Sequence, residues 1–162
     1  MALKKSSKLK SHSSRQAWEM VRAGIDYKTI GIEVGYTATA IKLFARNKYR
    51  AESEKLWAAE VKAVGHCEIC LSTYDNQAHH LLPKSIWTNL DRDLSNGICL
   101  CGDHHLFNVQ ISAHACPTAA AEFLVWLKEW RPGQWAWHEE HKHDRKYIGN
   151  DYELAYNELI KE

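Results

Sequence analysis

Two short segments contain residues whose types and spacing are those of a metal site. Cys67 and Cys70 are separated by two residues, and the same spacing separates Cys101 from His104. Two such pairs bring two loops to one tetrahedral ion and leave no open coordination position, which is the usual arrangement of structural zinc. We therefore predict a structural zinc site formed by Cys67, Cys70, Cys101 and His104.

Zinc binding leaves a second set of polar residues unexplained. His79 and His80 lie between the two pairs, Asn96 precedes Cys101 by five residues, and His105 follows His104 directly. Their order is histidine, asparagine, histidine, with a zinc-type pair on each side. Histidine side chains can bind a metal ion or act as a general base, so these residues are candidates for a second site.

This pattern resembles the HNH endonuclease family, a branch of the ββα-metal nucleases, over roughly residues 66–112. The resemblance implies that His80 is the general base and that His79 and His105 bind a catalytic divalent metal. It also implies that Asn96 bonds backbone groups across the loop and holds the segment of the base in place. Taken alone, Asn96-Gly97 would be an ordinary turn dipeptide.

The chain departs from the family pattern at two positions. His104 stands where the family usually has a fourth cysteine, which leaves open whether His104 or His105 binds the zinc. Family members often supply a third ligand to the catalytic metal one helical turn after the residue that corresponds to His105. That position is Val109 here, so the neighbouring Asn108 is the local candidate for this ligand.

The resemblance implies a metal-dependent DNA endonuclease, similar in size and layout to phage-borne HNH enzymes of the homing or nicking kind. The catalytic metal is expected to be magnesium or manganese, with nickel and zinc as alternatives, and the partner is double-stranded DNA. One rival function is a zinc-containing DNA-binding regulator without cleavage activity. Another is a nuclease that acts on branched DNA or RNA. The presence of all four residues His79, His80, Asn96 and His105 favours the enzyme.

Charge is distributed unevenly along the chain. Residues 1–50 hold eleven Lys and Arg against three Asp and Glu, a net of +8, and residues 51–162 hold ten against seventeen, a net of −7. A basic segment ahead of an acidic one suggests that the N-terminal part approaches nucleic acid.

Gly31, Gly35 and the aliphatic Ile41 have helix-turn-helix spacing, and the segment resembles such units of phage and transposon proteins. A small helical packing unit without DNA contact is the alternative. The predicted DNA-binding residues are Thr37, Thr39, Lys42, Arg46, Lys48 and Arg50.

The predicted fold is α+β and mostly helical, with a helix-turn-helix unit ahead of a zinc-stabilised ββα-metal module and flanking helices. We expect a flexible basic tail at 1–13, the helix-turn-helix at 14–50, a connecting helix at 51–65, the nuclease module at 66–116 and a helical extension at 117–162. Within the module, strands are expected at 77–81 and 97–101 and a helix at 103–112. Pro117 at a favoured first position begins a helix to Trp130, and Pro132-Gly133 marks a stop.

The remaining cysteines and histidines are expected to be structural. Cys99 reads as a buried thiol and Cys116 as core or helix-start packing. His12, His66 and His114 are assigned to the surface or the core, and the cluster of His138, His141 and His143 to a solvated face rather than to a metal site. No apolar run is long enough to span a membrane and no signal-peptide pattern is present, so a cytoplasmic protein is expected, in the host cytoplasm if phage-encoded.

Overall fold

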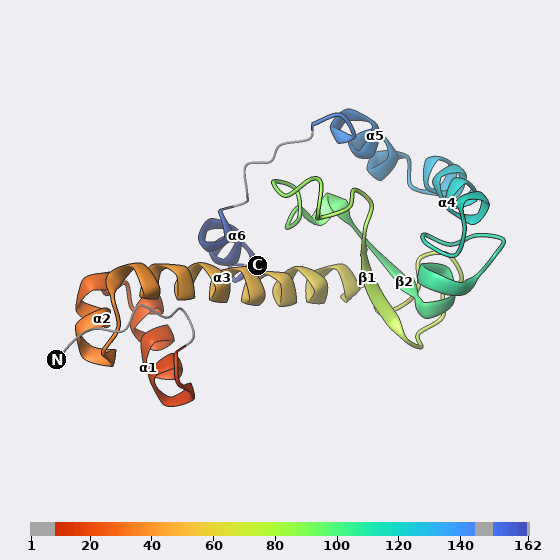
Figure 1. The fold of residues 1–162 in the computed structure, drawn as a ribbon. Helices are drawn as coiled ribbons and strands as arrows, with labels where there is room; N and C mark the ends of the chain where they lie inside the picture. Colours follow the sequence, from red (N-terminus) through yellow and green to blue (C-terminus); the bar gives the residue numbers. More distant parts are fainter. Residues whose placement is uncertain (1–8, 145–150, 162) are drawn as a thin grey trace. The chain divides into compact units, whose positions relative to one another are not determined.

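The computed structural model describes residues 9–144 and 151–161, and Figure 1 shows its elements in chain order. The chain is mostly helical with one small sheet. It divides into two compact units, which we call the helical unit and the hairpin unit. The helical unit comprises Met1–Ser53 and Tyr152–Asn157, and the hairpin unit comprises Glu54–Asp151 and Glu158–Glu162. The long helix α3 contributes residues to both.

The helical unit begins with α1 (Ser11–Arg22), α2 (Tyr27–Val34) and the first half of α3 (Ala38–Lys62). The Asp26 side chain accepts hydrogen bonds from the first N–H groups of α2, and Gly35 ends α2 in the left-handed conformation. At Gly31 a Cβ atom would lie 2.5 Å from the Tyr36 carbonyl oxygen, so only glycine allows this close approach. The cap at Asp26, the turn at Gly35 and the close approach at Gly31 are all local features of the sequence.

The core of the helical unit includes a helix from the C-terminal part of the chain. Ala17, Ile30, Ile41 and Phe44 form its centre, and Tyr152 of α6 (Tyr152–Leu159) belongs to the same cluster. Aromatic rings join the elements: those of Trp18, Tyr49 and Tyr156 lie within 4.9 to 6.3 Å of one another. The predicted extension at 117–162 is therefore divided, because part of α6 packs with the N-terminal helices.

The hairpin unit contains the only sheet among the described residues. Strand β1 (Asn76–His80) pairs antiparallel with β2 (Gly97–Cys101), so that His80 faces Gly97 and Asn76 faces Cys101. A Cβ atom on Gly97 would clash with a methyl of Val61, so the end of α3 packs closely against the start of β2. A short 3-10 turn, η1 (Leu94–Asn96), leads into β2.

Three further helices follow the hairpin: η2 (Asp103–Phe107), α4 (Pro117–Trp130) and α5 (Pro132–His141). Ile98 and Leu100 of β2 and Phe123 and Leu127 of α4 form the core of this unit. The backbone carbonyl of Gly97 accepts a hydrogen bond from Gln134 of α5 at 2.7 Å. In the part of the chain that the structure describes, no helix combines the length and apolar character that crossing a membrane requires.

The structure corrects two predicted elements. The expected helix at 103–112 is a single π-helical turn that ends at Phe107. Pro132-Gly133 ends α4 as predicted, but Pro132 also occupies the first turn of α5, where its missing N–H leaves no carbonyl unsatisfied. The connecting helix expected at 51–65 is the second half of α3, which continues without a break to Lys62.

Candidate active site and metal centres

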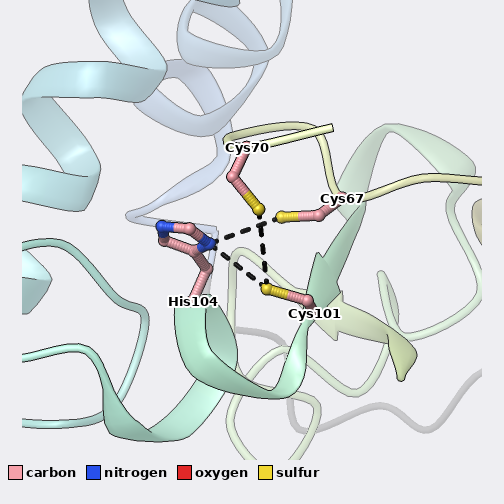
Figure 2. Close-up of side chains that lie close together, drawn as sticks. All are labelled: Cys67, Cys70, Cys101 and His104. Carbon is pink, nitrogen blue, oxygen red and sulfur yellow. Dashed lines mark hydrogen bonds between the residues drawn. The ribbon is translucent and has the colours of Figure 1, made fainter. Parts of the chain in front are cut away.

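Cys67, Cys70, Cys101 and His104 form a cluster whose ligand atoms all lie within 4.8 Å of one another (Figure 2). The Cys70 and Cys101 sulfurs are 3.8 Å apart, and His104 Nδ1 lies 3.3 Å from the Cys101 sulfur and 3.6 Å from the Cys67 sulfur. Tetrahedral zinc, with its usual bond lengths, would space two sulfurs about 3.8 Å apart and a sulfur and a nitrogen about 3.6 Å apart. The four residues therefore fit a metal ion such as zinc.

A tight backbone turn shapes the Cys67–Cys70 side of this cluster. The Cys67–Cys70 turn is closed by a hydrogen bond from Leu71 N–H to the Cys67 carbonyl, and Leu71 takes a positive φ of 61°. Burial would raise the pKa of the Cys67 thiol, but backbone N–H groups of Cys101 and Cys70 aimed at its sulfur lower it overall. A lowered thiol pKa favours the thiolate that metal binding requires.

A second cluster brings His79, His105 and His114 together, again with one ligand atom from each within 4.8 Å of the others. The ring centroids are 5.0 Å apart for His79 and His105, 4.8 Å for His79 and His114, and 5.3 Å for His105 and His114. His79 is buried, His105 is half-buried and His114 is exposed. Three imidazoles at this spacing can hold one metal ion and leave open coordination positions.

Different elements supply the three histidines. His79 is on β1 and His105 is in η2. His104 and His105 are adjacent in the chain, but His104 belongs to the Cys3His cluster and His105 to the second cluster. His114 comes from the loop between η2 and α4, which the bond from Ala113 N–H to the His104 carbonyl ties back to η2 at 2.9 Å. Sequence reasoning assigned His114 to the surface or the core, because no local motif links it to His105.

Burial favours the neutral form of His79 and His105 in the second cluster. Burial lowers the pKa of His79 to about 3, and the neighbouring rings of His105 and His114 add to the effect. Burial likewise lowers the pKa of His105. Neutral imidazoles are the form that binds metal, so burial prepares these two side chains to act as ligands.

The ring of His80 is fixed on two sides. It stacks on the buried Trp57 of α3, with ring centroids 3.8 Å apart and an interplanar angle of 13°. Its Nε2 lies 3.0 Å from the Asp91 carbonyl oxygen. Because a carbonyl only accepts, Nε2 carries the hydrogen in the neutral ring and Nδ1 has the lone pair. Burial lowers the pKa of His80, and Lys84 contributes in the same direction, so the neutral form is favoured.

Asn96 joins the strand that carries His80 to the loop that holds its ring. Its Oδ1 accepts a hydrogen bond from Leu82 N–H at 2.7 Å, and its Nδ2 donates to the carbonyls of Leu82 and Leu90 at 3.1 and 3.0 Å. Leu82 is two residues after His80, and Leu90 directly precedes Asp91. The fully buried amide thus connects both segments that determine the position of the His80 ring.

Gln77 of β1 holds the ring of His105 of η2 in place through a hydrogen bond. His105 Nδ1 donates to Gln77 Oε1 at 2.7 Å, and Gln77 Nε2 donates to Asp75 Oδ2 at 3.2 Å. This arrangement leaves His105 Nε2 as the nitrogen that can bind a metal. Neither Gln77 nor Trp57 was singled out from the sequence, because their roles depend on the hairpin register and on the packing of α3.

A shallow hollow exposes this histidine site to solvent. Its lining includes His79, His80, His105 and His114 together with Lys84 and Ser85. His79 and His80 are adjacent on β1, and His79 contacts Phe123 of α4 whereas His80 contacts Trp57. Although their rings have different neighbours, both reach the same hollow.

Several predicted or considered residues lie elsewhere. The Asn108 side chain accepts hydrogen bonds from the N–H groups of Gln110 and Ile111, and Asn108 lines a hollow on the Cys70 side rather than the one at His79. Among the described residues, His138, His141 and His143 are not brought together as a metal cluster. Cys99 is fully buried, and the Cys116 sulfur accepts from Ala119 N–H at the start of α4.

The predicted DNA-binding residues lie on or just before α3. Thr39, Lys42, Arg46 and Arg50 are exposed and recur at helical spacing, so they share one face of α3. Thr37 instead caps this helix through a bond from Ala40 N–H, and Lys48 is half-buried. The Arg50 guanidinium lies over the Tyr152 ring at 5.8 Å.

Most of the candidate metal and catalytic residues thus form two groups, a Cys3His cluster and a histidine site. Asn108 lies outside both groups, and His114 joins His79 and His105 in the histidine site. Comparisons with protein-family models, with curated proteins and with solved structures found no match for this chain. The function is therefore inferred from the chemistry of these two groups.

Proposed function

We propose that this protein is a metal-dependent DNA endonuclease of the HNH type. The observation that supports this most is the hollow in which His79, His105 and His114 lie within metal-binding distance beside the oriented ring of His80. A three-imidazole site with an adjacent neutral histidine combines the two requirements of phosphodiester hydrolysis, a cation site and a base. The Cys3His cluster alone would serve a structural zinc protein, so the second group favours the enzyme over that rival.

In this proposal His80 is the general base and Nδ1 is the atom that takes the proton from the attacking water. The Asp91 carbonyl holds the hydrogen on Nε2, and Trp57 supports the flat face of the ring. When Nδ1 takes a proton, the imidazolium keeps its hydrogen bond to Asp91. Asn96 maintains this arrangement because it fixes both the end of β1 and the loop before Asp91.

The donor sets favour particular metals. Three cysteines and one histidine in a closed tetrahedral arrangement suit zinc in a structural role. Three imidazoles suit zinc, nickel or other first-row transition ions better than magnesium, which prefers oxygen ligands and octahedral geometry. A divalent ion at His79, His105 and His114 would neutralise charge on the phosphate and on the leaving oxygen. Gln77 would hold His105 in the required orientation.

The exposed face of α3 supports double-stranded DNA as the substrate. Thr39, Lys42 and Arg46 project from the helix that follows the Gly31 and Gly35 turn, as a recognition helix of a helix-turn-helix unit would present them. The charge split of +8 against −7 supports the same assignment, because phosphate contacts provide most non-specific DNA affinity.

Cleavage of supercoiled plasmid tests this function. The purified protein should convert the plasmid to nicked or linear product when supplied with manganese, nickel or zinc, and less well with magnesium. Mapping of the ends separates nicking from double cutting, and parallel reactions with branched DNA and RNA test the other substrates. Tight plasmid binding with no cleavage under any of these metals would favour the rival function, a zinc-containing DNA-binding regulator.

A further inference from the structure

We propose that Lys84 and the three-histidine cluster together form an anion site that takes one phosphodiester group. This inference deepens the nuclease function proposed above and rests on it for the identity of the anion. It assigns to Lys84 direct contact with a non-bridging phosphate oxygen.

The position of Lys84 is the first argument. Lys84 follows His80 by four residues and lines the same hollow as His79, His105 and His114, next to Ser85. Its side chain is 48% exposed, so the ammonium can reach a ligand that enters from solvent. An ammonium group is a compact positive charge suited to a phosphate oxygen.

The ion pairs around Lys84 are the second argument. Lys84 pairs with Glu54 of α3, and the other oxygen of Glu54 lies 3.3 Å from the Arg92 guanidinium. The Arg92 side chain is 2% exposed and also donates to the Asp91 carbonyl at 2.7 Å, so it is fixed in the protein. Glu54 therefore keeps a cationic partner when Lys84 moves toward a ligand.

The cost of releasing Lys84 is small for this reason. Solvent-exposed ion pairs contribute little stability, and the Glu54 charge remains paired to Arg92. Lys84 is thus the cation of this network that can exchange its protein carboxylate for a phosphate. The carboxylate, in turn, holds the ammonium near the hollow before the ligand arrives.

A small diester with a single phosphate tests this site without the contribution of the α3 face. Hydrolysis of bis(4-nitrophenyl) phosphate should be measured for the full-length parent and for Lys84→Ala, Lys84→Arg and Lys128→Ala, each loaded with the same metal. Lys128 is an exposed lysine of α4 outside the lining of the hollow, so its removal controls for net charge. Binding of inorganic phosphate to the same proteins, followed by calorimetry, provides a readout that does not depend on turnover.

We expect Lys84→Ala to lower kcat/KM by about 10-fold or more and to weaken phosphate binding, since hydrogen bonds to charged groups are among the stronger ones. Lys84→Arg should recover most of both, Lys128→Ala should change neither, and metal content should be equal in all four proteins. If Lys84→Ala matches Lys128→Ala in hydrolysis and in phosphate binding, the anion site is refuted while the nuclease function stands. If the parent binds phosphate through Lys84 but hydrolyses neither the diester nor DNA, the anion site stands and the nuclease function fails.

Discussion

At the scale of residues, hydrogen-bond partners assign a separate task to each nitrogen of the site. The Asp91 carbonyl occupies Nε2 of His80, Gln77 occupies Nδ1 of His105, and the cysteine sulfurs face Nδ1 of His104. Each of these three histidine rings therefore has one nitrogen already engaged, which limits what its other nitrogen can do. Because the choice of nitrogen determines which lone pair is available, the surrounding backbone and amide groups define the chemistry as much as the histidines do.

The three-histidine site predicts that His114→Ala weakens binding of the second metal. Loss of one of three ligands should reduce metal affinity by at least about 10- to 100-fold, since even loss of a supporting partner of a ligand has an effect of that size. Competitive titration against a chromophoric chelator measures it, and His12→Ala, which removes an exposed histidine of α1, is the control. Unchanged stoichiometry and affinity in His114→Ala would exclude His114 as a ligand.

The Cys3His cluster predicts that Cys67→Ser loses tightly bound zinc and much of the stability of the hairpin unit. Removing one ligand leaves three donors in a site whose metal binding is coupled to folding. Elemental analysis should give about two metal ions per chain in the metal-loaded parent and one fewer in the variant. Cys116→Ser, which keeps an acceptor at the start of α4, should retain both. Equal zinc content and equal melting temperature in Cys67→Ser and the parent would rule out this site.

At the scale of elements, the sequence predicted those features that depend on residues close together in the chain. Asp26 and Gly35 delimit α2 and Pro117 begins α4, because caps and turns are encoded by neighbouring residues. The strands expected at 77–81 and 97–101 are observed at Asn76–His80 and Gly97–Cys101. The sequence did not reveal that His114 joins His79 or that α6 packs with α1. Those contacts depend on a loop and on a packing surface whose partners are far apart in the chain.

The packing of α6 in the helical unit predicts a loss of stability at alkaline pH. Burial, reinforced by the Glu153 carboxylate, raises the pKa of Tyr49 to about 12. In the unfolded chain the phenol loses its proton near pH 10, so the unfolded state releases protons first and folding weakens as the pH rises from 10 to 12. Tyr49→Phe should reduce this alkaline loss of helical signal, and Tyr74→Phe, at an exposed position, should not. Identical alkaline transitions in Tyr49→Phe and the parent would contradict the buried position of Tyr49.

At the scale of the whole molecule, charge is divided between two parts of the chain. The basic segment, residues 1–50, belongs to the helical unit, and the acidic segment, residues 51–162, carries the Cys3His cluster and the histidine site. In the proposed function the acidic segment would repel DNA at long range, so recruitment of DNA would depend on the basic helices. The division was visible in the sequence as charge. What the sequence could not give was the limit of each unit, since residues of α3 belong to both and part of α6 belongs to the helical unit.

This division predicts that Lys42→Ala with Arg46→Ala weakens DNA binding without changing hydrolysis of a small diester. Losing two phosphate contacts should make the plot of log affinity against log salt shallower by about 1.8, because each contact contributes about 0.9. Fluorescence anisotropy with duplex DNA at several salt concentrations measures the slope. Lys128→Ala with Lys161→Ala removes the same charge from exposed positions of the hairpin unit and should leave the slope unchanged. Equal slopes in both double variants would mean that the α3 face does not contact DNA.

The most direct test of the central claim is plasmid cleavage by His80→Ala under single-turnover conditions with the metal that best supports the parent. The variant should retain both metal ions and full DNA affinity, because His80 lies outside both ligand sets. Its cleavage rate should fall by about 10²- to 10⁴-fold, the usual effect of losing a general base. A His80→Ala protein that cuts as fast as the parent would contradict the account at its centre.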